Sequence, residues 1–540
     1  MRKRTRNYLI GFAVIIVAVV CADYLFKKKF FESTADRINA LLHRNNKVTV
    51  KGDTESLLSP DFLKKYYTGY TYRKTWTDST RANDKYRDML LSMLRHADSL
   101  GLNRNDYHQD YLNRIDSLSH LPHFDYSAFE SENEVIFTDA ALSFLYNVAY
   151  GREIQIGYAG VKYNVDSARI LRMFNGLITT CDWRSTLDSI EPRNAQYVTL
   201  KSELNRMNAV LRALPGLDSI QVSSKPEDKN RVMEKLKAYG VLPDSVRTDS
   251  VTTAPVPRWA VKDFQAMMSI DTTGALDAKT ITQLNFPMTQ RLDQLRESLN
   301  YWRWTGRLRD NEFILVNIPA AHLQIVRNDS TTELSMNVIV GKTTSQTPSF
   351  TAYINKVITY PYWTVPRDIA IKEMLPKILK SIDYLDNNNL QVINNKGKVI
   401  EPEKVEWSKL SKDYFPYTIR QSTGCDNSLG VLKFEISSPY SIYLHDTNRR
   451  DLFGKKDRFM SHGCIRLEKP MELAGYILGN ALDSTLTDSL NMCLKNQIPR
   501  EIPLKKPFPV LIFYMPADID EKGHLKFYND VYGIEEKKVA

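Results

Sequence analysis

The sequence predicts an α+β protein of several domains, and three observations support this fold class. The chain has 540 residues, which at about 150 residues each suggests three or four domains. The first half places apolar residues at three- and four-residue spacing, which is typical of helices. Much of the second half is β-branched and partly alternating, which is typical of strands. We therefore expect a helical N-terminal half followed by a mainly β C-terminal domain.

The positive charge of the chain is concentrated at its N-terminus. The net charge is +10, and residues 1–29 hold seven basic residues and one acidic residue. The uncharged run 8–22 follows the first basic cluster, as in secretory signals, although it is short for a spanning helix of about 20 residues. We predict that residues 1–29 form a signal anchor in the membrane, with a cleaved signal or a lipidated Cys21 as alternatives. The remainder is then exported, and the charge does not indicate nucleic-acid binding.

Residues 30–226 are predicted to form a helical scaffold domain. The segments 83–100 and 131–149 have clear helical periodicity. His120 and His123 are close in sequence, but the leucine and proline between them argue against a metal pair. The domain shows no catalytic constellation, so we expect a scaffold or docking role.

Residues 227–288 are predicted to form a small bundle of three helices. The first helix ends at Gly240, and a Ser/Thr/Pro-rich stretch, 244–257, separates it from a helix–turn–helix at 259–285. The second part resembles a peptidoglycan-binding domain with an AVKxFQ helix, a GxLDxxT turn and a closing LN. The matching residues are Ala260, Val261, Lys262, Phe264, Gln265, Gly274, Asp277, Thr280, Leu284 and Asn285. A helical spacer is the alternative.

Residues 289–540 are predicted to form one mainly β domain after a connecting helix at 291–304. Strands are expected at 313–326, 334–340, 354–360, 430–436, 441–444 and 510–515. Residues 367–415 interrupt them with helical and polar character. We expect this segment to form a lid subdomain inserted between strands.

The strongest chemical signal is a histidine that precedes a Ser-His-Gly-Cys sequence. Fifteen residues separate His445 from Ser461-His462-Gly463-Cys464. A nearby imidazole can accept the proton of a thiol and later return it to a leaving amine. The pattern 468–480 predicts a helix just after Cys464, whose N-terminus would favour a thiolate. The sequence therefore predicts a cysteine nucleophile with a histidine base.

This arrangement matches the catalytic signature of L,D-transpeptidases (YkuD-type domain), which the chain resembles over about 289–520. The segments 338–342, 346–348, 360–366 and 420–430 also resemble the family's strands. With the helical front and the small bundle, the chain resembles the larger, scaffold-containing YcbB-like subgroup. The resemblance implies an L,D-transpeptidase catalytic domain with an inserted lid.

The resemblance also implies roles for individual residues. Cys464 is the acylated nucleophile, His445 the general base and acid, and the backbone carbonyl of Asp446 orients His445. Ser461, His462 and Gly463 form the active-site loop, in which the amides of Gly463 and Cys464 are expected to bind the oxyanion. Residues expected to contact substrate are Arg466, Tyr443 and Trp363. A structural ion pair is the alternative role for Arg466. No metal or cofactor is expected.

The implied reaction joins two peptidoglycan stem peptides. The thiol takes the acyl group of a donor tetrapeptide, D-Ala leaves, and an acceptor stem amine forms a 3→3 crosslink. Carbapenem-type inhibitors are expected to acylate the same thiol, and the enzyme is expected on the periplasmic side of the inner membrane. The alternatives are an L,D-carboxypeptidase, an enzyme that attaches proteins to peptidoglycan, or a non-catalytic wall-binding scaffold.

The other cysteines carry no catalytic motif. Cys181 and Cys493 are expected to be core residues. Cys425 departs from the subgroup's usual proline, and we expect it to be a bystander, with a disulfide or a second reactive thiol as alternatives.

Overall fold

The computed structural model describes residues 34–534, apart from 44–45, 51–52, 70–73, 77–82, 122–128, 247–254, 310–311, 328–331 and 493–496. The predicted anchor at 1–29, Cys21, His123 and Cys493 lie outside the described residues. In the part that is described, no helix has both the length and the apolar character needed to cross a membrane.

The chain forms two compact units that interleave in sequence. The first contains Met1–Arg152 and Val165–Pro192, and the second contains Glu153–Asn164 and Arg193–Ala540. Residues 153–164 and 193–226 therefore pack with the C-terminal part rather than with the helices predicted as a single scaffold at 30–226. The division into four domains remains a prediction.

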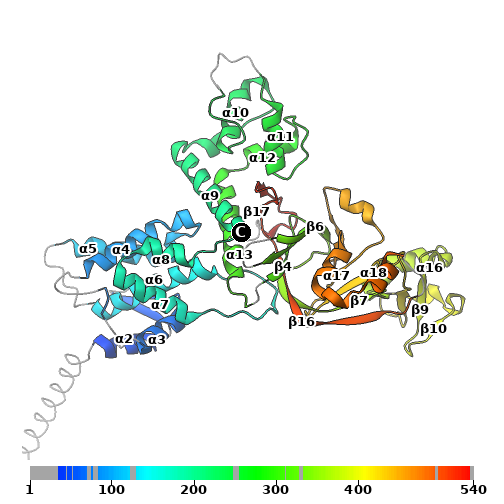
Figure 1. The fold of residues 1–540 in the computed structure, drawn as a ribbon. Coiled ribbons are helices and arrows are strands. Elements are labelled where there is room, and N and C mark those ends of the chain that lie inside the picture. The colour runs from blue at the N-terminus through cyan, green and yellow to red at the C-terminus, as the bar shows by residue number, and fades with distance from the viewer. Residues whose placement is uncertain are drawn as a thin grey trace, which may run out of the picture. The chain divides into compact units, whose positions relative to one another are not determined.

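The first unit is helical, with one short hairpin of β1 (Lys47–Val50) and β2 (Asp53–Ser56). Its helices, blue to cyan in Figure 1, are α2 (Thr34–Leu42), α3 (Pro60–Gly69), α4 (Asp84–Arg95), α5 (Gln109–Ser119), α6 (Glu130–Tyr150), α7 (Ser167–Thr180) and α8 (Trp183–Ile190). The helices predicted at 83–100 and 131–149 correspond to α4 and α6. Helix α6 is buried on nearly all its faces, because the other helices pack around it.

The second unit begins with helices. These are α9 (Ala195–Ala213), α10 (Lys229–Ala238), α11 (Arg258–Met267), α12 (Ala278–Asn285) and α13 (Met288–Thr305). Helix α13 packs on α9, and the Arg303 guanidinium donates to the Tyr197 hydroxyl at 2.7 Å. Helix α10 ends at Ala238, and Gly240 two residues later has a φ of +76°, a conformation that glycine adopts without strain.

The strands of this unit form one large sheet. They are β3 (Tyr158–Ala159), β4 (Glu312–Asn317), β5 (His322–Arg327), β6 (Thr332–Gly341), β7 (Phe350–Thr359), β12 (Leu432–Ile436), β13 (Leu444–His445), β14 (Phe459–Ser461), β15 (Ile465–Leu467) and β16 (Arg500–Phe513). Their order is β12-β13-β15-β6-β5-β4-β16-β7-β3, with β14 on β6, and an additional β12–β7 pairing closes the sheet on itself. Apolar side chains from these strands fill its interior.

Three features of the sheet differ from the sequence-based expectation. The strand predicted at 313–326 is a hairpin, β4 and β5, and the final strand is longer than predicted. The edge strand β3 comes from residues assigned to the scaffold and pairs in parallel with β7. A short hairpin of β17 (Ala517–Ile519) and β18 (Leu525–Phe527) follows β16.

The segment between β7 and β12 is a subdomain with its own core. It contains a sheet of β8 (Trp363–Thr364), β9 (Leu390–Ile393), β10 (Val399–Ile400) and β11 (Thr418–Gln421). Its helices are α14 (Arg367–Ile369), a π-helical turn at Ala370–Met374, α15 (Leu375–Ile378) and α16 (Asp383–Asn387). Its apolar cluster runs from Val365 to Ile419, so the inserted subdomain extends beyond the predicted 367–415 at both ends.

The helix predicted at 468–480 is α17 (Pro470–Leu478), which α18 (Ser484–Asn491) follows. Strand β15 lies between Cys464 and α17. Since a helix dipole acts mainly within the first turn, the predicted support of a Cys464 thiolate by this helix is wrong.

Candidate active site

Strands β13 and β15 place the predicted histidine and cysteine on one face of the sheet. The two strands are parallel neighbours, in which His445 pairs with Arg466 and Leu444 pairs with Ile465. Leu444 and Ile465 are fully buried in the sheet interior. Side chains alternate along a strand, so His445 and Arg466 face the side of the sheet opposite to this interior. Cys464, two residues before Arg466, lies on that same side.

His445 is buried, oriented and neutral. Its Nδ1 donates to the backbone carbonyl of Asp446 at 2.5 Å, so Nε2 is left as the acceptor nitrogen. Burial, followed by the positive charge of Arg466, lowers the pKa of His445 to about 3, although the Asp446 carbonyl acts in the opposite direction. A neutral imidazole with a fixed tautomer is suited to accept a proton at Nε2.

The Asp446 carboxylate has a structural role, because both of its oxygens accept hydrogen bonds. Its Oδ2 accepts the Val431 N–H at 3.0 Å, and its Oδ1 accepts Arg450 Nη2 at 2.7 Å. Gly430 has a φ of +58°, and a Cβ there would lie 2.2 Å from the Asp446 carboxylate, so the close approach requires glycine. The Asp446 side chain therefore fixes the loop before β12, and the Asp446 backbone carbonyl orients His445.

Cys464 is a half-buried free thiol. Its Sγ donates to the Ser441 carbonyl at 3.6 Å, and in the described residues no hydrogen bond joins it to His445. Burial raises the pKa of Cys464, although hydrogen bonds with Tyr443 and the positive charges of Lys433 and Arg466 act in the opposite direction. The resting site therefore holds a thiol and a neutral imidazole rather than an ion pair.

The loop before Cys464 is held by Ser461. The Ser461 hydroxyl donates to the Cys464 carbonyl at 2.6 Å and accepts the Gly463 N–H at 3.1 Å. The Gly463 amide, predicted to bind the oxyanion, is thus already engaged. The Cys464 N–H has no hydrogen-bond partner among the described residues, so one of the two predicted donors is free.

Arg466 lies in the site without a carboxylate partner. Its Nε is buried without a hydrogen bond, and within the described part of the chain no acidic side chain forms an ion pair with its guanidinium. Burial, followed by the charge of Arg449, lowers its pKa, and Cys464 acts in the opposite direction. This geometry favours a binding role over a structural ion pair, because a half-buried cation without a carboxylate partner in the described part of the chain can receive an anionic group.

Tyr443 connects the nucleophile with the inserted subdomain. Its ring meets the His445 ring edge to face at 5.6 Å, and Lys433 Nζ lies 4.3 Å from its centroid. Burial, followed by the neighbouring Cys464 thiol, raises the pKa of Tyr443, whereas hydrogen bonding with Trp363 lowers it. The structure thus brings Tyr443 to the thiol and Trp363 to Tyr443. Lys433, which the sequence analysis missed, pairs with His445 across β12 and β13.

His462 contacts the inserted subdomain. Its Nε2 lies 2.6 Å from Glu373 Oε1 in the π-helical turn, and Lys342 Nζ lies 3.8 Å from the same oxygen. Burial would raise the pKa of Glu373, but the hydrogen bond from His462 and the charge of Lys342 lower it. The sequence analysis assigned no role to Glu373 or to the Lys342 side chain, and only the folded chain reveals their contact with His462.

The structure also bears on the prediction for Cys425. Cys425 is disulfide-bonded, so the bystander interpretation is wrong, and neither Cys181 nor Cys464 is its partner because both are free. Among the described residues, no group of three His, Cys, Asp or Glu side chains is arranged to hold a metal ion.

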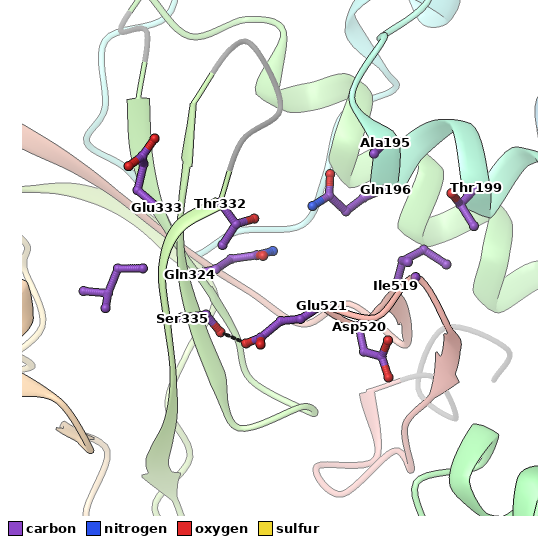
Figure 2. Close-up of a pocket in the computed structure, with 12 residues that line it drawn as sticks. Ala195, Gln196, Thr199, Gln324, Thr332, Glu333, Ser335, Ile519, Asp520 and Glu521 are labelled. Atoms are coloured by element: carbon purple, nitrogen blue, oxygen red, sulfur yellow. Dashed lines mark hydrogen bonds between the residues drawn. The ribbon is translucent and has the colours of Figure 1, made fainter.

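A separate polar pocket of about 380 Å³ lies elsewhere in the second unit. Figure 2 shows Gln196 of α9 and Gln324 of β5 facing each other across it, with Asp520 and Glu521 at one side. The pocket contains none of the predicted site residues, so the candidate active site is the face of β12, β13 and β15 described above.

Comparisons with known proteins agree with this location. Residues 311–495 match the family model of the L,D-transpeptidase catalytic domain (YkuD), and residues 61–204 match a model described as a scaffold domain. Residues 311–495 are therefore similar to an L,D-transpeptidase catalytic domain, and a region similar to a scaffold domain precedes them.

One similar curated protein is a "Putative L,D-transpeptidase" of Haemophilus influenzae, 34% identical over 222 residues. The match covers 41% of this chain and 44% of that protein, so the chain spans less than half of the relative's length. Similar solved structures include an L,D-transpeptidase from Mycobacterium smegmatis, at 15% identity over 38% of this chain and 58% of that one, with a TM-score of 0.19. Another, from Stackebrandtia nassauensis, has 13% identity over 53% and 91% of the two chains, with a TM-score of 0.19.

Proposed function

We propose that the protein is an L,D-transpeptidase that forms 3→3 crosslinks in peptidoglycan through a thioester on Cys464. The observation that carries the proposal is the placement of three groups on one face of a family-matched domain: a free thiol, a tautomer-fixed neutral imidazole, and a guanidinium whose Nε has no hydrogen bond among the described residues. Peptidoglycan stems supply an acyl group, a carboxylate and an amine, which suit these three groups.

In the first half-reaction, Cys464 Sγ attacks the carbonyl that joins the diamino acid at position 3 to D-Ala at position 4. His445 Nε2 accepts the thiol proton, and the Cys464 N–H and the Tyr443 hydroxyl are the donors near the developing oxyanion. When the C–N bond breaks, His445 returns the proton to the amine of D-Ala. The products are a thioester and free D-Ala.

In the second half-reaction, the side-chain amine of an acceptor stem attacks the thioester. His445 takes a proton from this amine and returns one to the departing Cys464 sulfur. The result is an amide between two stems and a regenerated thiol. Attack by water would instead release a tripeptide, and attack by a protein lysine would attach that protein to the wall.

Arg466 is proposed to couple substrate binding to proton transfer. In the free protein its positive charge opposes protonation of His445. A substrate carboxylate paired with Arg466 would neutralise that charge and make the imidazole a stronger base. The nucleophile would then be activated mainly when an anionic stem is bound, which limits unproductive reactions of the thiol.

The other parts of the chain receive roles that fit this proposal. The inserted subdomain acts as a lid over the bound stem, since its Trp363 and Glu373 contact Tyr443 and His462. The bundle of α10 to α12 binds peptidoglycan, as its resemblance implies. Residues 1–29 anchor the protein so that the catalytic domain works on the periplasmic side of the inner membrane.

The test uses the purified full chain in detergent with disaccharide-tetrapeptides and mass spectrometry of the products. Crosslinked dimers that lack one D-Ala are the expected result, and a Cys464→Ala variant should form none. Tripeptides without dimers would replace the proposal by carboxypeptidation. Absence of all products, together with absence of a covalent adduct with imipenem, would refute both enzymatic functions.

A further inference from the structure

Thr347, outside the motif that carries the nucleophile, contacts the backbone of the active-site loop. We propose that Thr347 is a positioning residue that aims the Cys464 N–H at the oxyanion, and that Tyr532 near the C-terminus holds Thr347 in place. The inference rests on the proposed function, because it assigns a task to the carbonyl-addition step. It adds two residues that lie far from Cys464 in the sequence, Thr347 on the N-terminal side and Tyr532 on the C-terminal side.

The contact that motivates the inference is a hydrogen bond to the peptide just before Cys464. Thr347 Oγ1 donates to the Gly463 carbonyl at 2.8 Å and accepts the Gly341 N–H at 2.9 Å. Only 1% of Thr347 is exposed, so water does not readily replace this bond. The hydroxyl therefore ties the end of β6 to the active-site loop.

This bond fixes the direction of the Cys464 N–H. The Gly463 carbonyl and the Cys464 N–H belong to one planar trans peptide, so they point in opposite directions. Anchoring the oxygen on Thr347 therefore sets where the N–H points. On the other side of the residue, Ser461 Oγ holds the Cys464 carbonyl at 2.6 Å. The peptide groups before and after Cys464 are thus both held by hydrogen bonds, which fixes the direction of the Cys464 N–H.

The loop needs such an anchor because Gly463 has a φ of +111°. Glycine is conformationally permissive, and a free loop would sample other backbone angles. Every such change would rotate the Gly463–Cys464 peptide away from its present plane. An oxyanion donor is useful only when it is already in place as charge develops.

Tyr532 holds Thr347 from the C-terminal segment. Its hydroxyl donates to the Gly341 carbonyl in a short hydrogen bond and accepts the Thr347 N–H at 3.3 Å. The Tyr532 N–H donates to the Tyr514 hydroxyl at 3.0 Å, and this hydroxyl donates to Asp530 at 2.7 Å. Tyr532 itself is buried. The C-terminal segment thus supports the turn that carries Thr347.

The test separates carbonyl addition from thiol reactivity. The variant Thr347→Val keeps the side-chain shape and removes the hydroxyl, Thr347→Ser restores the hydroxyl, and Thr351→Val is the matched control in another buried threonine. The full chain is acylated with imipenem and, separately, alkylated with iodoacetamide, with both rates followed by mass spectrometry. Alkylation at the thiol forms no oxyanion, so it reports the nucleophile alone.

We expect Thr347→Val to lower the acylation rate about 10- to 100-fold, somewhat less than the complete loss of an oxyanion donor, with alkylation unchanged within about twofold. Tetrapeptide turnover should fall in kcat rather than rise in KM, because the amide acts in the transition state. Thr347→Ser should recover most of the rate, Tyr532→Phe should lose less than Thr347→Val, and Thr351→Val should behave as the unmodified protein.

Two outcomes would overturn the inference while leaving the proposed function intact. One is normal acylation by Thr347→Val, and the other is an equal loss of acylation and alkylation, which would indicate a displaced thiol. If the unmodified protein is neither acylated nor active on tetrapeptides, the proposed function itself fails. Thermal melting of each variant identifies any general loss of folding.

Discussion

The first unit and the active-site face of the second unit differ in how many hydrogen-bond partners their polar groups have. In α6, the fully buried Asp139 accepts the N–H groups of Leu58 and Ser59 at 2.6 and 2.8 Å and also contacts His108 Nε2 at 2.9 Å. Glu134, equally buried, accepts two more backbone N–H groups. Each of these carboxylates has several partners, as a stable buried charge requires.

The active site leaves its polar groups without such partners. Arg466 has a buried Nε without a hydrogen bond, the Cys464 N–H is free within the described residues, and His445 has an open Nε2. We infer from this contrast that the paired carboxylates of α6 serve the fold, whereas the three groups of the active site are placed to receive a ligand. Substitutions in the two regions should therefore affect different measurements.

The largest expected effect comes from His445→Ala. Loss of the proton acceptor should slow imipenem acylation about 1000-fold, or about 4 kcal/mol in activation free energy. The melting temperature should fall modestly, because the buried ring loses its contacts with the Asp446 carbonyl and the Tyr443 ring. His322→Ala, in another histidine of the same domain, is the control and should acylate normally. Rapid acylation by His445→Ala would remove this residue from the mechanism.

Asp139→Ala should show the opposite pattern. It leaves two backbone N–H groups and the Nε2 of His108 unpaired in the helical core, which should cost about 3 kcal/mol of stability in the first unit. Hydrogen exchange of α6 measures this loss, and the acylation rate per folded molecule should stay within about twofold. The exposed Asp188→Ala in α8 is the control. Unchanged exchange in Asp139→Ala would contradict the assigned structural role.

Arg466→Met should have a smaller kinetic effect without a cost in stability. Removal of a half-buried cation that has no ion-pair partner among the described residues should leave the melting temperature equal or higher. Tetrapeptide kcat/KM should fall about 30-fold, because a charged hydrogen bond to a substrate carboxylate contributes about 2 kcal/mol. Iodoacetamide, which has no carboxylate, should react at nearly the normal rate. A marked loss of stability would restore the structural ion-pair interpretation.

The sequence identified the reacting residues because they belong to a short motif, a histidine followed at a fixed spacing by Ser-His-Gly-Cys. The spacing from His445 to Cys464, the strands and the helices at α4, α6 and α13 all follow from local patterns. The inserted subdomain was also predictable, since its composition interrupts the strands. Its bounds were not, because Val365 and Ile419 join its core only in the folded chain.

Contacts between distant segments explain what the sequence did not reveal. Nothing local to Gly463 shows that Ser461 engages its amide, or that Thr347 holds its carbonyl. The helix after Cys464 was predicted, but the intervening strand β15 was not, so the expected dipole effect was wrong. The disulfide of Cys425 likewise depends on tertiary proximity, which sequence spacing does not give.

The smallest expected effect is a pH dependence confined to the first unit. His108 bridges two carboxylates, with Nδ1 at 3.0 Å from Glu55 and Nε2 at 2.9 Å from Asp139. Burial alone would lower the pKa of His108, but hydrogen bonds to Asp139 and Glu55 raise it above 6.5. A raised pKa in the folded state means that the charged form stabilises the fold. This stability is present below pH 6.5 and is lost as pH rises through the folded pKa.

Hydrogen exchange in α5 and α6 should therefore become faster relative to its intrinsic rate between pH 6 and pH 8. In His108→Gln this dependence should disappear, because the glutamine does not titrate. The same measurement on β13 and β15 serves as the internal comparison and should show no such change in either protein, since His445 stays neutral over this range. A pH dependence that persists in His108→Gln would assign the effect to another group.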